Sequence, residues 1–235
     1  LTGFDKWVFD NFPKFHGQLH FSGTQTTETT PNKGTYIVVK DIPGSLFPAI
    51  SPKASAKQAV LNPGSKSSLS IELQLKIPEI STNATQVILQ KINPVDNHGF
   101  SIRLNPTMST STVETQFDVF SGSFHMSVSK EIEKGKFNHL CYVFDRDSSL
   151  HNLKLYNNEV LRLQTNSTVQ IGDLNIDYAD LLIGSGSQYK VGSSLINPGQ
   201  TLSGSIDELR IFHSARSLQQ QKSYAKKSIY ATNDL

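Results

Sequence analysis

The sequence predicts a single all-β domain, a two-sheet antiparallel sandwich followed by one short C-terminal helix. Serine and threonine make up about a fifth of the 235 residues, while apolar and charged residues make up only 37% and 18%. This composition favours strands and polar loops over long helices. Several segments alternate apolar and polar residues, as half-buried strands do. Glycine, proline and asparagine separate these segments at regular intervals, which is typical of sandwiches.

The N-terminal segment, residues 1–17, differs from the rest of the chain. Six large apolar residues fall within twelve positions: Phe4, Trp7, Val8, Phe9, Phe12 and Phe15. Exposed aromatic clusters of this size are uncommon in monomers. We therefore expect this segment to pack on the domain or on a neighbour, and the sandwich to occupy residues 18–235.

The first predicted strands show three patterns. Residues 18–21 alternate, whereas residues 35–39 are β-branched and apolar, which predicts a strand buried on both faces. Residues 69–77 alternate most clearly, and Pro78 ends this strand. The residues expected to face the core here are Leu69, Ile71, Leu73, Leu75 and Ile77, with the polar side chains outward.

Further strands and one helix complete the predicted domain. A hairpin is expected over residues 156–160, because asparagine tolerates the positive φ of tight turns. Ser217 and Gln220 form a capping box, which predicts a helix over residues 218–230. The remaining strands are expected over residues 86–90, 100–104, 115–120, 124–128, 137–144, 153–156, 160–163, 180–183 and 204–212.

Charge and cysteine content exclude several classes of protein. The net charge of +2 excludes a strongly basic surface for nucleic acid, and no apolar run approaches the length of a transmembrane helix. One cysteine, Cys141, excludes an internal disulfide and a cysteine-based zinc site. Its apolar strand predicts a small buried side chain. The alternative is a thiol nucleophile, since His139 lies on the same face of the strand.

Recognisable sequence motifs extend along most of the chain, from about Gln18 to Ala225. The segments that carry them are Ser68–Ile77, Gly99–Leu104, Lys136–Asp145, Asn152–Val160 and Gly204–Leu218. The last of these is the most specific and is similar to "G-x-I-D-E-V-R-I-Y-N-R-A-L-S", and Lys136–Asp145 resembles a "W-x-H-V-A-x-x-Y-D" strand. Together the segments resemble the concanavalin A-like lectin/glucanase superfamily, in its laminin-G-like and pentraxin-like branch. The resemblance implies that the two sheets form a jelly roll.

The resemblance also implies structural roles for residues of these motifs. Phe137 takes the place of the family's tryptophan and is expected in the core, where its replacement with alanine would cost about 3–5 kcal/mol. Tyr142 is expected to be structural as well. His139 is expected to be a packed strand histidine, and Asp207 to accept backbone hydrogen bonds near the end of its strand.

Some members of the superfamily are glucanases, which need two carboxylates flanking the scissile bond. Glu131 and Glu133 have the spacing of two residues on one face of a strand, but they are expected in a charged, solvated turn. No Ser/His/Asp constellation can be placed either. We expect no catalytic residue and no enzyme activity, and a glucanase-like hydrolase stays as the remaining alternative.

Loops supply the candidate binding residues. Carboxylates and carbonyl oxygens hold Ca²⁺ in many related modules, so calcium is the one possible cofactor, with Asp207 and Asp41 as candidate ligands. Mixed hydrogen-bonding and stacking groups are typical of recognition sites. The candidate ligand-binding residues of this kind are Asp96, Asn97, His98, Tyr189 and Lys190.

Asn83 and Asn166 each begin an N-x-Ser/Thr glycosylation motif in a predicted turn. These features predict a non-catalytic recognition or adhesion module, extracellular or on the cell surface, that binds a protein or a glycan. The alternative is a structural spacer or docking domain with neighbouring domains in a larger chain.

Overall fold

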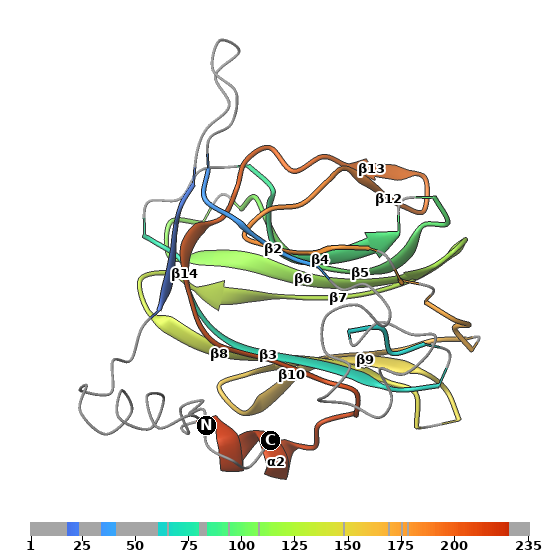
Figure 1. The fold of residues 1–235 in the computed structure, drawn as a ribbon. Coiled ribbons are helices and arrows are strands. Elements are labelled where there is room, and N and C mark those ends of the chain that lie inside the picture. Colours follow the sequence, from blue (N-terminus) through green and yellow to red (C-terminus); the bar gives the residue numbers. More distant parts are fainter. Residues whose placement is uncertain are drawn as a thin grey trace, which may run out of the picture.

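Two antiparallel six-stranded sheets pack face to face, and a small two-stranded sheet lies above one of them (Figure 1). The structure is a computed structural model that describes residues 18–23, 34–40 and 61–225, apart from 65, 80–83, 94, 108, 148, 169, 175 and 178. The predicted all-β sandwich is confirmed. Among the described residues, no helix is long and apolar enough to cross a membrane.

The first sheet has the strand order β1-β14-β3-β8-β9-β10. Its central strand β3 pairs with β14 on one side and with β8 on the other, all antiparallel. The bounds are β1 Leu19–Ser22, β3 Leu69–Lys76, β8 Phe137–Asp145, β9 Asn152–Asn157, β10 Val160–Asn166 and β14 Ser203–Phe212.

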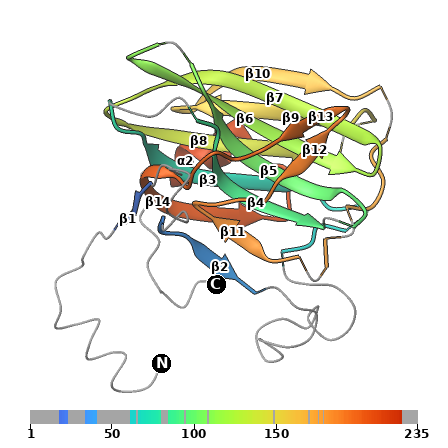
Figure 2. The same cartoon turned by 90° about the horizontal axis from the view of Figure 1, so that it is seen from above.

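The second sheet has the order β2-β11-β4-β5-β6-β7. Figure 2 shows β2 and β11 along one side of the sandwich and β7 along the opposite side, next to β10 of the first sheet. The bounds are β2 Ile37–Val39, β4 Gln86–Asn93, β5 His98–Asn105, β6 Thr112–Ser121, β7 Phe124–Glu133 and β11 Leu181–Ile183. The small sheet is a hairpin of β12, Tyr189–Val191, and β13, Ser194–Ile196.

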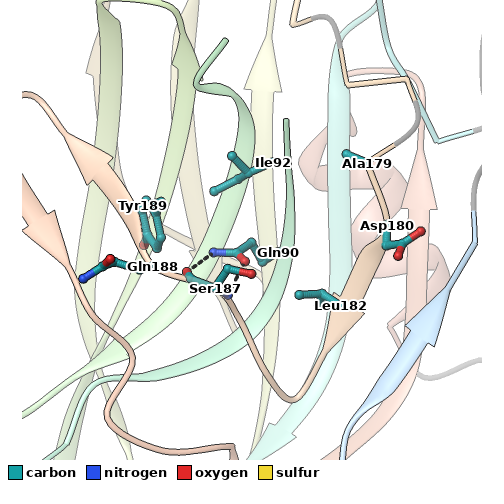
Figure 3. Close-up of a pocket in the computed structure, with 8 residues that line it drawn as sticks. All are labelled: Gln90, Ile92, Ala179, Asp180, Leu182, Ser187, Gln188 and Tyr189. Carbon is teal, nitrogen blue, oxygen red and sulfur yellow. Dashed lines mark hydrogen bonds between the residues drawn. The ribbon is translucent and has the colours of Figure 1, made fainter. Parts of the chain in front are cut away.

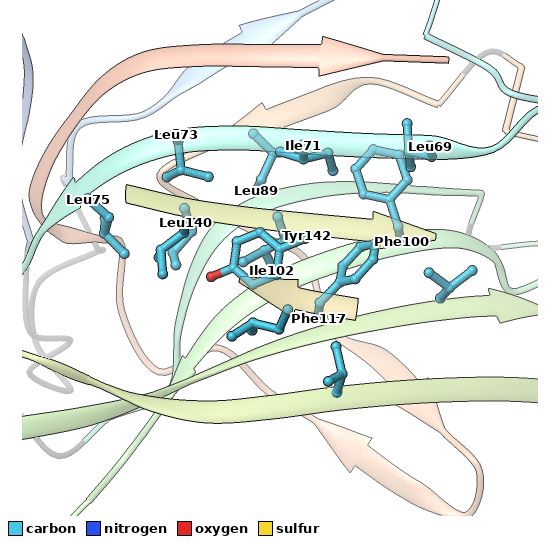
Figure 4. Close-up of a cluster of buried hydrophobic side chains, with 14 of the residues drawn as sticks. Leu69, Ile71, Leu73, Leu75, Leu89, Phe100, Ile102, Phe117, Leu140 and Tyr142 are labelled. Carbon is cyan, nitrogen blue, oxygen red and sulfur yellow. The ribbon is translucent and has the colours of Figure 1, made fainter. Parts of the chain in front are cut away.

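The hydrophobic core fills the space between the two large sheets (Figure 4). All five apolar residues predicted on the inner face of residues 69–77 are completely buried, so the predicted register of β3 is confirmed. Tyr142 of β8 is also buried and packs against Phe117 of the second sheet, with ring centroids 5.6 Å apart. Its hydroxyl makes a 2.5 Å hydrogen bond with the hydroxyl of Thr115.

The C-terminal segment covers part of the outer face of the first sheet, over the strand β3. The helix α2, Leu218–Tyr224, lies against this face (Figure 1). Before it, Arg216 Nε donates to Glu72 Oε1 at 3.0 Å, and the side chains of both residues are buried. The polar residues of β3 do point away from the core as predicted, but Ser70 and Glu72 are buried under this C-terminal segment. Their burial depends on residues more than 140 positions away, which local alternation does not reveal.

Two predictions about burial are wrong. Phe137 is 39% exposed, because it lies on the outer face of the first sheet at the start of β8, where the Lys76 ammonium lies 6.0 Å from the centroid of its ring. Residues 35–39 do not form a strand buried on both faces, since β2 is an edge strand and Val38 and Val39 are exposed.

The predicted hairpin and helix are present. Asn158 and Glu159 form the turn between β9 and β10 with φ values of 51° and 55°. Ser217 and Gln220 make the reciprocal hydrogen bonds of a capping box at the start of α2. The predicted helix beyond residue 225 and the aromatic segment 1–17 lie outside the described residues.

Candidate functional site

The outer face of the second sheet carries a continuous set of polar side chains. Alternation along β6 directs Val113, Thr115, Phe117 and Val119 to the core. The residues between them therefore face outward: Glu114, Gln116 and Asp118. Strand register places further polar residues beside these three, because Ser101 and Ser127 flank Asp118, while Arg103 and Ser129 flank Gln116.

Asp118 is the centre of a buried network on this face. Arg103 Nε lies 3.2 Å from Asp118 Oδ2, and both side chains are almost completely buried. This contact is an ion pair without the alignment of a hydrogen bond, since the same Nε has no hydrogen-bond partner. Gln116 Nε2 donates to Asp118 Oδ1 at 2.7 Å, and His125 Nε2 lies 3.1 Å from the same oxygen. The carboxylate is therefore held by a fixed set of neighbours.

The network continues toward the far end of β6. Asn105 Nδ2 donates to Glu114 Oε2 at 2.7 Å and to Gln116 Oε1 at 2.8 Å. Ser129 donates to Glu114 Oε1 at 2.8 Å. These bonds fix the side chains of this partly exposed region before any ligand binds, and preorganisation of this kind lowers the entropic cost of recognition.

The hairpin of β12 and β13 covers part of the polar face. Tyr189 packs edge-on against Phe120 with centroids 5.4 Å apart, and its hydroxyl lies 3.5 Å from Asp118 Oδ2. Burial, together with the nearby Asp118 carboxylate, raises the pKa of Tyr189 to about 12. The phenol is therefore neutral at physiological pH, and its hydroxyl can donate a hydrogen bond to the Asp118 carboxylate.

A pocket of about 320 Å³ opens where this hairpin meets β4 and β11 (Figure 3). This size is near the lower end of the roughly 300–1,000 Å³ range of small-molecule sites. The lining residues are Gln90, Ile92, Ala179, Asp180, Leu182, Ser187, Gln188 and Tyr189. Apolar side chains thus stand next to amide, hydroxyl and carboxylate groups in one concavity.

Gln90 fixes one wall of the pocket. Its side-chain amide donates to the backbone oxygen of Ser187 at 3.0 Å and accepts from the backbone nitrogen of Ser187 at 2.7 Å. This pair of bonds continues the pairing of β4 onto the segment that leads into β12. On the opposite side, the carboxylate of Asp180 accepts from Lys40 at 2.6 Å.

The structure separates the predicted ligand-binding residues. Tyr189 lines the pocket, whereas Lys190 is exposed and does not line it. Asp96 and Asn97 lie in the turn between β4 and β5, where Asn97 donates to the carbonyl of Gly122 at 3.2 Å. His98 begins β5, and its Nδ1 is buried without a partner. The residues of this turn do not line the pocket, so the five candidates do not form one site there.

The polar row on β6 was missed from the sequence, although a signal for it is present. Residues 113–119 alternate as strictly as residues 69–77, and the outward positions carry Glu, Gln and Asp. The sequence does not reveal which strands pair with β6, nor that the β12–β13 hairpin covers part of its outward face.

Glu131 and Glu133 lie on strand β7, not in a turn as predicted. Both are exposed; Glu131 accepts from Thr112 at 3.2 Å and Glu133 pairs with Lys136 at 2.5 Å. These contacts hold two surface side chains in solvent and form no cleft.

Cys141 has the buried position that its sequence context predicts. Its side chain is completely buried on the outer face of the first sheet, and its Sγ lies 3.9 Å from Glu72 Oε1. Burial, reinforced by the Glu72 carboxylate, raises the pKa of the thiol well above its usual value. His139 is also buried, and burial lowers the pKa of its imidazole. A protonated, covered thiol is a poor nucleophile.

Asp207 stabilises its own backbone. It sits at an irregularity of β14, where its Oδ1 accepts from the backbone nitrogen of Glu208 at 2.8 Å and Glu208 has a φ of 52°. This agrees with the backbone-bonding role expected for it. The proposed partner Asp41 lies outside the described residues. Within residues 18–23, 34–40 and the described parts of 61–225, no group of three or more His, Cys, Asp or Glu side chains could hold a metal ion.

Comparisons with known proteins agree with this architecture. Residues 52–220 match the laminin-G-type family described as the concanavalin A-like lectin/glucanases superfamily. The comparison with curated proteins finds no match. Among solved structures, the chain is similar to the CBM40 domain of the Ruminococcus gnavus IT-sialidase bound to α2,3-sialyllactose. The identity is 13%, with 87% of this chain and 97% of that chain covered and a TM-score of 0.51.

Two other solved structures are similar to the chain. NanB with Optactamide is 16% identical over 88% of this chain and 28% of that chain, with a TM-score of 0.52. A heptameric SAP-like pentraxin from Limulus polyphemus is 18% identical over 82% of this chain and 83% of that chain, with a TM-score of 0.49.

Two antiparallel sheets of six strands, closed by a short C-terminal helix, define a concanavalin A-like sandwich. The matched family covers most of the chain, and the protein therefore belongs to the concanavalin A-like lectin/glucanase superfamily.

Proposed function

We propose that this protein is a non-catalytic, lectin-like module that binds glycans on the outer face of its second sheet. The observation that carries the proposal is the pocket beside the β12–β13 hairpin. Sugars present apolar ring faces and hydroxyl groups together, and the pocket offers matching groups: Ile92 and Leu182 as apolar walls, Gln188 and Ser187 as polar partners.

The kind of protein that shares the fold supports the same class of function. The similar Ruminococcus gnavus domain is a carbohydrate-binding module with a bound oligosaccharide. Its low identity transfers the fold and not the ligand. The proposal therefore depends on the pocket of this chain for its site.

The chemistry of the face supports binding rather than hydrolysis. Asp118 is completely buried and held by Arg103, Gln116 and His125. Glu114 accepts two hydrogen bonds from neighbouring side chains. A general acid or a nucleophile needs access to the substrate, and these contacts occupy the carboxylates.

A glycan array probed with and without Ca²⁺ tests the proposal. We expect Gln188→Ala to weaken every glycan interaction of the wild-type protein, because it removes a hydrogen-bonding group from the pocket. Lys190→Ala is the matched control, since Lys190 lies two positions after Gln188 but does not line the pocket.

Three results would contradict this placement. Loss of binding in Asp96→Ala with full binding in Gln188→Ala would move the site to the turn between β4 and β5. Strict dependence on Ca²⁺ would favour the calcium proposal for Asp207 and Asp41. An array with no signal at all would favour the alternative, a docking or spacer domain that contacts a protein.

We further propose that the protein is extracellular or on the cell surface and carries N-linked glycans. Asn166 is exposed at the end of β10, where an oligosaccharide has room. Asn83, the other candidate, lies outside the described residues. Expression through a eukaryotic secretory pathway should give a mass that falls after enzymatic deglycosylation, and Asn166→Gln should remove one step of that fall.

A further inference from the structure

The charge of the pocket differs from what an acidic sugar requires. None of the eight lining residues is Lys, Arg or His. The lining contains two ionisable groups, Asp180 and Tyr189, and the raised pKa of Tyr189, about 12, keeps that phenol neutral. Among the described lining residues, the one formal charge is therefore the negative charge of the Asp180 carboxylate.

Among the described residues, the cations near the pocket already have partners, and the buried Lys91 donates to the backbone oxygen of the lining residue Ala179 at 2.5 Å. Arg103 is the buried cation of the polar face, and its side chain is 8% exposed with Nε 3.2 Å from Asp118. Lys40 lies outside the lining and pairs with Asp180 at 2.6 Å. Within the described part of the chain, a carboxylate or sulfate entering the pocket would lose water without gaining a free cationic partner.

Neutral sugars suit the same groups better. Asp180 is one-third exposed on its side chain and can accept hydrogen bonds from sugar hydroxyls. Gln188 can both donate to and accept from a hydroxyl, and Leu182 and Ile92 offer surface for the ring face. None of these interactions needs a charge on the ligand.

We infer that the pocket selects neutral sugar residues and discriminates against sialylated or sulfated ones. This inference rests on the proposed glycan-binding function and deepens it. It also separates this chain from the similar Ruminococcus gnavus domain, whose solved structure contains sialyllactose.

Matched ligands provide the test. Binding of lactose and of α2,3-sialyllactose to the full chain is measured by titration calorimetry, alongside an array of neutral glycans and their sialylated and sulfated counterparts. We expect the neutral member of each bound pair to bind at least about tenfold more tightly, because the acidic group is desolvated without a partner. Raising the salt concentration should leave neutral binding unchanged, since no ion pair to the ligand forms.

Two variants, one of Asp180 and one of its partner Lys40, should shift the selectivity for neutral glycans in opposite directions. Asp180→Asn removes the negative charge and should narrow the ratio between neutral and acidic glycans. Lys40→Gln leaves the Asp180 carboxylate without its cation and should widen that ratio. A melting temperature close to that of the wild type shows that each variant is folded.

The outcomes distinguish the inference from the function beneath it. Equal or tighter binding of the acidic partners, lost in Gln188→Ala, would overturn the selectivity and leave glycan binding standing. An unchanged ratio of neutral to acidic glycan affinity in both Asp180→Asn and Lys40→Gln would also overturn it, since Asp180 would then play no part in selection. Absence of binding to all glycans would overturn the proposed function itself.

Discussion

The buried carboxylate of Asp118 connects several polar side chains on the outer face of the second sheet. Its carboxylate contacts Arg103, Gln116 and His125, and its side chain is completely buried. Asp118→Ala should therefore lower the free energy of unfolding by about 3–5 kcal/mol, because Arg103 would stay buried without its counter-ion. Urea denaturation measures this change.

The surface variant Glu131→Gln is the control for Asp118→Ala. It removes an exposed carboxylate on the same sheet and should change stability by less than about 0.5 kcal/mol. Equal small effects of both variants would show that the Asp118 network contributes little to folding.

Tyr142 and Phe137 lie on the same strand and should respond very differently to substitution. Tyr142→Phe leaves the buried hydroxyl of Thr115 without its 2.5 Å partner and should cost about 1–3 kcal/mol. Phe137 is 39% exposed, so Phe137→Ala should cost less than about 1 kcal/mol, well below the range for a core aromatic. Denaturant midpoints of the two variants compare them directly, and a larger loss for Phe137→Ala would contradict the observed burial.

At the scale of elements, the strand β4 positions the segment that lines the pocket and leads into the β12–β13 hairpin. Gln90 reaches the backbone of Ser187 with both atoms of its side-chain amide. Gln90→Ala should weaken glycan binding by roughly tenfold while costing about 1 kcal/mol of stability, because the loop loses its anchor but the core is unchanged. Hydrogen exchange at the Ser187 amide should become faster.

Gln74→Ala is the matched control for this anchor. Gln74 also donates a side-chain hydrogen bond to a backbone oxygen, that of Ala225, but it does so on the other sheet. It should leave glycan affinity and exchange at Ser187 unchanged. Equal losses of affinity in the two variants would contradict a specific role for Gln90.

How far the sequence predicts these elements depends on the range of the interactions. The inward residues of β3 and the turn at Asn158 follow from local rules, alternation and positive φ, and both predictions are confirmed. The exposure of Phe137 depends on what covers the outer face of the first sheet, and the motif it belongs to carries no information about that cover. A resemblance to a family motif predicts a strand but not how far its outward side chains are exposed to solvent.

At the scale of the molecule, the candidate site is a product of topology. Gln90 and Ser187 are 97 positions apart, and Asp118 and Tyr189 are 71 apart. Tyr189 was predicted as a binding residue, yet only the fold of the second sheet brings it beside Gln90. The turn at Asp96 and Asn97 follows the same strand β4 but ends away from the pocket lining. Loop membership was thus too coarse a criterion for a site built from a sheet face.

At the scale of the molecule, the buried thiol and phenol groups should make the folded domain less stable at alkaline pH. Burial raises the pKa of Cys141, Tyr142, Tyr156 and Tyr189 above the ordinary values of 9.0 for the thiol and 10.0 for the phenols. Each group therefore binds its proton more tightly in the folded state than in the unfolded state. Below the unfolded pKa values both states keep these protons, and these groups leave stability unchanged. Above them only the unfolded state releases these protons, so stability falls as pH rises.

We therefore expect the free energy of unfolding to stay nearly constant between about pH 7.5 and 8.5 and to decrease from about pH 9 onward. Urea titrations across this range measure the decrease. Cys141→Ala removes one of the four groups and should make the decrease less steep near pH 9, where the unfolded thiol titrates first. Throughout the constant region the wild-type thiol should not react with iodoacetamide until the protein unfolds, because it is both protonated and completely covered. Rapid alkylation of the folded protein at neutral pH would show instead that the cover formed by the C-terminal segment opens in solution.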